Sequence, residues 1–173
     1  MAGSIAPISS IGVPREVKPD EQRVALTPDA VRELVSHGLS VRVEQNAGAG
    51  AGIEDAAYVA AGAELVSRED AWGAHLVVKV KEPQVEEFPF LRADQVLFTY
   101  LHLAAYPAVG QALIEAGTTA IAYETVQLAD GSLPLLAPMS EIAGRLAAQG
   151  GAHLLERSEG HTSELQSPCN LVC

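Results

Sequence analysis

Short apolar segments alternate with segments of helical periodicity along most of this chain, and this alternation restricts the fold more than any other feature. The apolar segments lie at residues 11–14, 40–45, 64–66, 76–80, 95–101 and 119–123. Helical signals lie at residues 27–38, 54–62, 67–70 and 104–117. Strands that alternate with helices at this spacing are typical of a parallel sheet covered by helices on both faces. We therefore predict a three-layer α/β fold.

A second kind of pattern begins near Pro138, where a longer helix is predicted with Ser140 as its N-terminal cap. From Ser158 onward the periodicity stops. These changes predict four parts: a flexible N-terminus (1–10), one α/β domain (11–138), an inter-domain helix (139–157) and a patternless tail (158–173).

The tail holds both cysteines of the chain, Cys169 and Cys173. It resembles the translation of a sequencing adapter joined to an incomplete gene, so we expect the natural sequence to differ after Arg157. An ordinary disordered tail is the alternative. Because the rest of the chain lacks cysteine, neither a disulfide framework nor a metal site built on thiolates is expected, and no metal is predicted.

Composition narrows the class of protein. The chain has 173 residues, of which 48% are hydrophobic, enough for one domain with a sizeable core. The formal net charge of -11 makes nucleic acid a poor partner. No apolar run is long enough to span a membrane, and the start of the chain lacks the pattern of a signal peptide. We expect a cytoplasmic protein that acts on a small molecule.

Three polar residues follow predicted strands and are candidates for chemistry. Arg23 comes after the first strand, Lys81 after LVVKV and His102 after QVLFTYL. Ligands of α/β sheets bind where loops leave the carboxyl ends of the strands, so the three side chains are expected to converge at one edge. An arginine can hold a carboxylate, a lysine can polarise a carbonyl, and a histidine can transfer protons near neutral pH.

Each candidate also has a plain structural interpretation. Arg23 could be a surface residue paired with Asp20 or Glu21. Lys81 could pair with Glu82, although Lys79 lies on the same predicted strand face and two buried ammonium groups call for an anion. His102 could be a histidine of the core.

Two further features bear on cofactor binding. The glycines of residues 48–52 lack the spacing of a dinucleotide fingerprint, so we interpret this run as a flexible turn. Ser140 lies at the predicted start of a helix, where free backbone N–H groups could contact a cofactor or be satisfied by simple capping.

Five segments carry a resemblance to a known family. The segments IGVPREVKPDEQRVALTP, LVVKVKEP, LFTYLHLAA, AYETVQ and LPLLAPMSEIAGRLAAQ are similar, in order and separation, to the N-terminal part of NAD-dependent alanine dehydrogenases. The related nicotinamide nucleotide transhydrogenase α subunits share a start like RVALTP but are not expected to carry the histidine of LHLA. The resemblance covers residues 11 to about 157.

The resemblance implies a Rossmann-like substrate domain and reversible oxidative deamination of L-alanine to pyruvate and ammonium with NAD. It implies that Arg23 and Lys81 bind the substrate, that His102 is the proton donor and acceptor, and that Ser140 contacts the cofactor. Family members continue into a dinucleotide-binding domain and are usually hexamers, so the chain is expected to be an incomplete homo-oligomeric enzyme, inactive alone. The alternatives are a transhydrogenase α-subunit domain and a non-catalytic module that binds 2-oxo acids.

Overall fold

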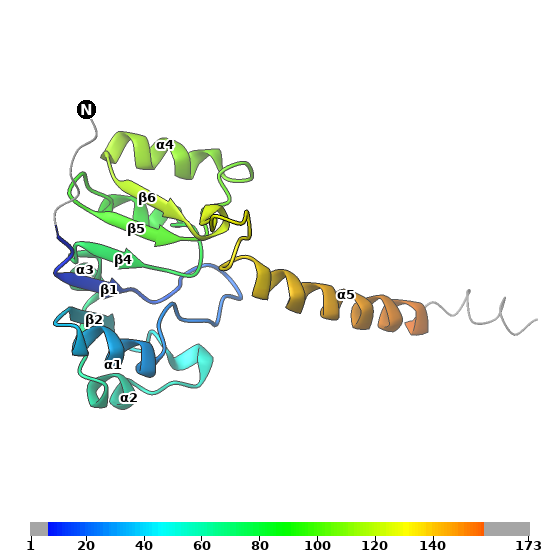
Figure 1. Cartoon of the computed structure of the whole chain (residues 1–173), viewed down its shortest axis with the longest axis horizontal. Coiled ribbons are helices and arrows are strands. Elements are labelled where there is room, and N and C mark those ends of the chain that lie inside the picture. The colour runs from blue at the N-terminus through cyan, green and yellow to red at the C-terminus, as the bar shows by residue number, and fades with distance from the viewer. Residues whose placement is uncertain (1–6, 158–173) are drawn as a thin grey trace, which may run out of the picture. The chain divides into compact units, whose positions relative to one another are not determined.

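The computed structural model describes residues 7–157, and its centre is one parallel sheet (Figure 1). Every neighbouring pair of strands is parallel, in the order β3-β2-β1-β4-β5-β6. The chain builds β1 to β3 outward on one side and then returns to place β4 on the other side of β1. The predicted α/β class is confirmed. The strands are β1 (Ser10–Val13), β2 (Ser40–Glu44), β3 (Glu64–Val66), β4 (Leu76–Val78), β5 (Val96–Thr99) and β6 (Thr119–Ala122).

Helices connect the strands and lie close to the segments where helical periodicity predicts them. Short 3-10 turns supplement them after β2, β4 and β6. The α-helices are α1 (Pro28–Ser36), α2 (Asp55–Ala60), α3 (Arg68–Trp72), α4 (Pro107–Ala116) and α5 (Ala137–Arg157), and the 3-10 helices are η1 (Ala49–Ala51), η2 (Val85–Phe90) and η3 (Tyr123–Thr125).

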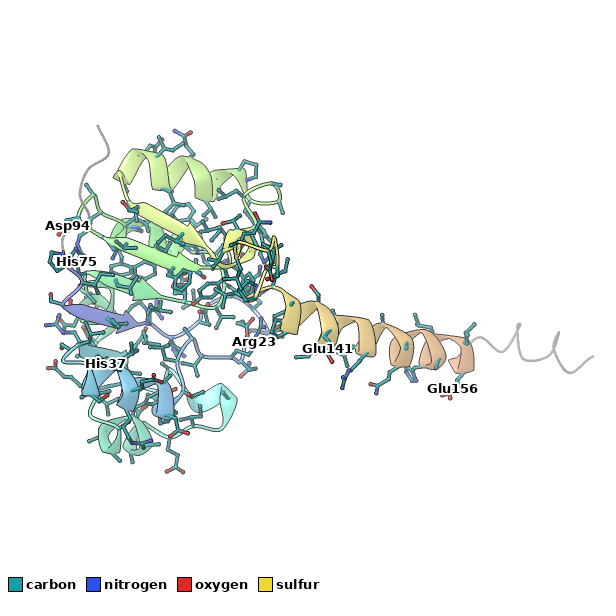
Figure 2. All side chains as sticks on the ribbon, in the orientation of Figure 1. Arg23, His37, His75, Asp94, Glu141 and Glu156 are labelled. Atoms are coloured by element: carbon teal, nitrogen blue, oxygen red, sulfur yellow. The ribbon has the colours of Figure 1, made fainter. Side chains whose placement is uncertain are left out.

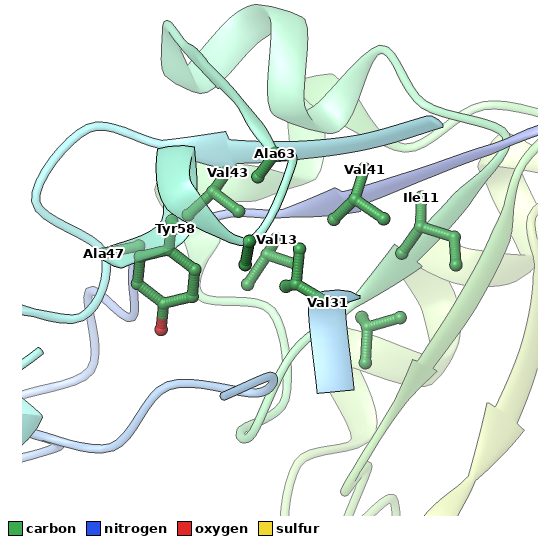
Figure 3. Close-up of a cluster of buried hydrophobic side chains, with 10 residues drawn as sticks. Ile11, Val13, Val31, Val41, Val43, Ala47, Tyr58 and Ala63 are labelled. Carbon is green, nitrogen blue, oxygen red and sulfur yellow. The ribbon is translucent and has the colours of Figure 1, made fainter. Parts of the chain in front are cut away.

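Two apolar cores cover the opposite faces of the sheet, which gives the three layers. The first core joins β1 and β2 to α1 and α2 and includes Val31 and Tyr58 (Figure 3). The second joins β4 and β5 to α3 and α4 around Trp72. Successive residues of a strand point to opposite faces, and accordingly Val78 belongs to the first core and Val77 to the second.

The ends of α1 form as the sequence indicates. The hydroxyl of Thr27 accepts a hydrogen bond from the backbone N–H of Ala30, and Pro28 is the first helical residue. After the helix, Gly38 adopts a φ of 83°, which a residue without a Cβ reaches most easily. These signals fix the length of the loop that carries Arg23 from β1 to α1.

The glycine run after β2 is a packed turn rather than the flexible one that its composition predicts. A Cβ on Gly50 would lie 2.4 Å from Oε1 of Gln22, and a Cβ on Gly48 would lie 2.8 Å from the carbonyl oxygen of Ile53. Gln22 belongs to the loop between β1 and α1. Gly50 therefore lets these two loops approach each other closely, whereas Gly48 makes room for Ile53 within its own turn.

The chain forms two compact units that divide between Val126 and Gln127, and α5 lies in the second unit. Ser140 is the fourth residue of α5, and its N–H donates to the carbonyl of Leu136 at 3.1 Å. The prediction that Ser140 caps this helix is therefore wrong, because the helix begins at Ala137. The proposed tail from residue 158 lies outside the described residues.

Candidate functional site

The three predicted residues all lie in loops that leave the carboxyl ends of strands. Arg23 lies between β1 and α1, Lys81 lies three residues after the end of β4, and His102 lies three residues after the end of β5. The strands β1 and β4 are neighbours at the point where the strand order reverses, which is where open α/β sheets bind ligands. Figure 2 shows Arg23 at this edge, whereas His75 and Asp94 lie at the opposite edge.

Arg23 is oriented by Glu21, which was one of the two partners of its plain structural interpretation. The Nε of Arg23 donates to Oε1 of Glu21 at 2.7 Å, and Nη2 donates to Oε2 at 2.5 Å. This pairing lowers the pKa of the Glu21 carboxyl, and the charge of Lys81 lowers it further. Arg23 thus contacts Glu21 directly, and the charge of Lys81 acts on the same carboxylate.

The two lysines of LVVKVK, Lys79 and Lys81, have different surroundings, although the sequence puts them on one strand face. Lys79 is fully buried, and its Nζ lies 2.8 Å from Oε1 of Glu87 and 3.1 Å from Oε2 of Glu16. Lys81 is half-buried at the edge. The anions that two buried ammonium groups would call for are therefore present, but they serve Lys79.

The alternative partner for Lys81 is engaged elsewhere. Glu82 is 1% exposed and pairs with Lys18, whose ammonium also lies 4.7 Å from the centre of the Tyr106 ring. This pairing ties the loop after β1 to the loop after β4. Glu16 also lies in the loop after β1. Burial raises the pKa of its carboxyl, and the charge of Lys79 acts in the opposite direction.

His102 lies half-buried at the edge and stacks on a neighbouring aromatic ring. The rings of Tyr100 and His102 are nearly parallel, with centroids 5.7 Å apart and an interplanar angle of 6°. Burial raises the pKa of the Tyr100 hydroxyl, and the charge of Arg23 partly offsets this rise. Tyr100 thus contacts His102 and feels the charge of Arg23, so it links two of the predicted residues.

The backbone of His102 is unusual and is held by a carboxylate. Its φ is 47°, in the left-handed region, and its N–H donates to Oε1 of Glu124 at 2.7 Å. Sequence reasoning missed Glu124 and Tyr100, and it named Glu21 only as a surface partner of Arg23. The available signal for Glu124 was its place in AYETVQ, directly after a predicted strand that ends at the same edge.

A cavity of about 180 Å³ also borders Arg23. Its lining includes Glu16, Glu21 and Asn46 but neither Lys81 nor His102. The cavity therefore lies between the loops after β1 and β2, beside the predicted site.

Within residues 7–157, no group of three His, Cys, Asp or Glu side chains could hold a metal ion. No helix in that range has the length and apolarity to cross a membrane.

Ser140 is exposed and belongs to the second compact unit, so the structure describes it apart from the other three candidates. The glycine run offers no phosphate cradle, because the space beside Gly48 and Gly50 is filled by the chain itself. The groups that gather at the sheet edge are two cations, a histidine and their carboxylate partners. Such cations can bind an anionic ligand such as a carboxylate or a phosphate group.

Comparisons with known proteins show what the chain is similar to. Residues 12–143 match the family described as "Alanine dehydrogenase/PNT, N-terminal domain". An alanine dehydrogenase of Bacillus subtilis (strain 168) is 56% identical over 152 residues, which cover 87% of this chain and 40% of that protein. A solved L-alanine dehydrogenase superposes with a TM-score of 0.81 at 55% identity, covering 87% of this chain and 42% of its own.

A more distant solved structure is a transhydrogenase from Sinorhizobium meliloti. Its TM-score is 0.63 at 32% identity, and the match covers 66% of this chain and 35% of that chain. The chain therefore spans about 40% of the length of the curated relative described above.

Proposed function

The chain belongs to the family of alanine dehydrogenase/PNT N-terminal domains, and on that premise we propose that it is the substrate-binding part of an alanine dehydrogenase. The proposed reaction converts L-alanine, water and NAD to pyruvate, ammonium, NADH and a proton. One observation carries the proposal: Arg23, Lys81 and His102 leave the carboxyl ends of β1, β4 and β5, around the point where the strand order reverses.

Arg23 and Lys81 would bind and orient the substrate. The planar guanidinium of Arg23 suits a carboxylate, and Glu21 already fixes its orientation through two hydrogen bonds. Lys81 would stabilise negative charge on the oxygen of the reacting carbon, at a half-buried place where such a charge is poorly hydrated. Together they would present the Cα of alanine in one orientation, which is catalysis by positioning.

His102 would move the protons of the reaction. Water must add to the imine of alanine and lose a proton, and the amine must gain a proton before it leaves as ammonia. The hydroxyl of the carbinolamine loses its proton as the carbonyl of pyruvate forms, and ammonia takes up a proton to become ammonium. One imidazole can perform both steps, since it takes the proton from water and returns it to the amine. Support comes from the position of His102 at the edge and from its stacking on Tyr100, which limits the orientations of the ring.

NAD, when bound, accepts the hydride that leaves the alanine Cα. Of the residues described, Ser140 fits a contact with this cofactor, because its exposed hydroxyl can donate a hydrogen bond to a ribose or carboxamide group and accept one. On the family resemblance we further propose that the protein is cytoplasmic and works as a homo-oligomer, a hexamer by that resemblance.

The test uses a protein that carries this chain and oxidises alanine. We expect His102→Ala to lower the turnover of pyruvate amination by a factor of at least about 100, the low end of what a general acid-base contributes. NADH binding, measured by fluorescence, should be retained. The matched control is His75→Ala, because His75 lies at the opposite edge of the sheet (Figure 2). Turnover of His102→Ala within a few-fold of the parent protein would refute the assignment.

The similarity to the Sinorhizobium meliloti transhydrogenase supports a second candidate, a transhydrogenase α-subunit domain. The higher identity to alanine dehydrogenases and the histidine of LHLA favour the first. Oxidation of alanine in the absence of a second nicotinamide nucleotide would separate the two functions. A module that only binds 2-oxo acids would bind pyruvate but give no turnover with NADH and ammonium.

A further inference from the structure

The backbone at His102 has a conformation that the surroundings must enforce. In the left-handed region the Cβ of a residue approaches its own carbonyl oxygen, so residues other than glycine enter it at a cost. Within residues 7–157, the only residues other than glycine with a positive φ are Asp20, Asn46 and His102. His102 alone among the three is a candidate for chemistry, and its φ is 47°.

The carboxylate of Glu124 holds the N-terminal side of this residue. Oε1 accepts hydrogen bonds from the N–H of His102 at 2.7 Å and from the N–H of Leu101 at 3.1 Å. Oε2 lies 3.3 Å from the same N–H of Leu101. Two successive backbone N–H groups that converge on one anion form a concave binding site, and hydrogen bonds to a charged acceptor are stronger than neutral ones.

The C-terminal side of His102 is held as well. Its carbonyl accepts from the N–H of Ala105 at 2.8 Å and from the N–H of Tyr106 at 3.1 Å. Hydrogen bonds therefore fix the peptide groups on both sides of His102, and only its side-chain torsions can change. Stacking on Tyr100 restricts those torsions.

The register of the sheet places Glu124 where it can do this. Strands β5 and β6 are parallel, and Thr99 pairs with Ala122 at their carboxyl ends. His102 and Glu124 follow these two residues by three and two positions. Tyr123, next to Glu124 in η3, packs edge-on against Tyr100 with centroids 5.0 Å apart. The turn after β6 thus supports both the backbone of His102 and the ring beneath it.

We propose that Glu124 is the positioning residue for His102: its carboxylate holds the left-handed backbone and so sets the direction in which the imidazole faces the substrate. Glu124 acts through the backbone of His102, so it is distinct from the groups proposed to contact the substrate. The effect on catalysis rests on the function proposed above. The structural part of the inference does not depend on that function.

Three substitutions separate the geometry of Glu124 from its charge. Glu124→Gln retains an oxygen at the place of Oε1, which takes both N–H groups, and removes the charge. Glu124→Asp retains the charge but draws the carboxylate back by roughly 1.5 Å, one C–C bond. Glu124→Ala removes both. Glu115→Ala is the matched control, because this glutamate is exposed on α4 and accepts a hydrogen bond from the side chain of Gln111, away from His102.

The first measurement is amide hydrogen exchange by NMR on the whole 173-residue chain. For the N–H groups of Leu101 and His102, we expect Glu124→Gln to lose less than about tenfold in protection, because the amide oxygen still accepts both hydrogen bonds but without the charge. Glu124→Asp and Glu124→Ala should lose protection by about 10- to 150-fold, the range for one hydrogen bond to a charged group. Unchanged protection in Glu124→Asp, or loss in Glu124→Gln alone, would overturn the inference whatever the activity. If Glu124→Ala does not fold, the Asp and Gln variants still decide.

The second measurement is the pyruvate amination kinetics of an active protein that carries this chain. Glu124→Asp should lower kcat by about 100-fold, as a displacement near 1 Å can, while KM for pyruvate stays within a few-fold. Glu124→Gln should keep most of the kcat of the parent protein. If His102→Ala is inactive but Glu124→Asp keeps full kcat, this inference fails and the proposed function stands. If both variants keep full kcat, the proposed function fails too.

Discussion

Replacing Lys79 with methionine should destabilise the protein far more than replacing an exposed cation. The side chains of Lys79 and Glu87 are 0% exposed and that of Glu16 is 3% exposed. Methionine keeps the length of the lysine stem but leaves two buried carboxylates without their cation. Removing one partner of a buried ion pair costs about 3–5 kcal/mol, because the remaining charge is uncompensated. We expect a loss in the free energy of unfolding within that range at pH 7.

The penalty should depend on pH in a definite direction. Burial raises the pKa of Glu16 above its ordinary value, and Lys79 opposes that rise. Without Lys79 the folded-state pKa rises further, so the folded protein binds a proton more tightly than the unfolded chain. Stability then falls as pH rises from about 4.5 through the raised pKa, by up to about 1.4 kcal/mol per pH unit. The variant should therefore lose more stability at pH 8 than at pH 5.

Urea unfolding followed by circular dichroism measures the effect. Trp72, the single tryptophan of the chain, offers a second signal because it is buried and stacks on Phe90 at 5.8 Å. Its ring centre lies 5.8 Å from Nζ of Lys79, so fluorescence also senses the substitution directly. Circular dichroism therefore gives the free energy of unfolding, and fluorescence tests whether the core around Trp72 unfolds together with the rest of the chain.

Two controls isolate the buried charge. Arg32→Met removes a cation that is 60% exposed and paired with Asp29, and it should cost no more than about 1 kcal/mol. Adding Glu16→Gln and Glu87→Gln to the lysine variant removes the orphaned charges and should recover most of the loss. A cost below about 1 kcal/mol for Lys79→Met, with no dependence on pH, would refute the reasoning.

Two further predictions concern the substrate and the sheet. Arg23→Lys should raise KM for pyruvate by about tenfold, because the planar fork is lost, and an unchanged KM would contradict the proposed contact. Gly12→Ala should cost at least about 2 kcal/mol in urea unfolding, since its Cβ would lie 1.9 Å from the carbonyl oxygen of Ala71. The control is Gly144→Ala on α5, where a Cβ meets nothing within 4 Å and should be neutral or stabilising. An equal cost at both glycines would contradict the steric explanation.

The sequence predicts the layered fold because apolar periodicity and helix capping are local signals. Thr27 and Pro28 begin α1 as expected, and the predicted strands all form. The same dependence on local signals explains the wrong prediction for Ser140. The helix begins at Ala137, where the sequence has no marked capping residue, so the sequence points to the hydroxyl of Ser140, three residues later, as the cap. Helix boundaries depend on the balance of neighbouring residues, and one candidate cap cannot fix them.

The site is predicted less completely, because its partners are far apart in sequence. The strand-end rule places Arg23, Lys81 and His102 at one edge, but it does not find the carboxylate that holds the last of them. Glu124 lies 22 residues from His102 and reaches it only through the register of β5 and β6. The sequence pattern also does not show that Lys79 is the buried lysine, because its burial depends on Glu16 and Glu87, which come from other segments of the chain.

Carboxylates hold the loops at the carboxyl ends of the strands: Glu21 holds Arg23 within one loop, whereas Glu82 holds Lys18 and Glu124 holds the amide of His102 in another loop. The pairing of Glu21 with Arg23 is lost when the carboxylate of Glu21 takes up a proton, whereas the apolar contacts of the sheet do not depend on protonation. For Glu21 the pKa is lowered, so its contribution is present above about pH 4.5 and disappears as pH falls through the lowered value. Acid should therefore release Arg23 from the carboxylate that orients it, so the carboxylate-binding group proposed for the substrate should lose its fixed orientation at low pH.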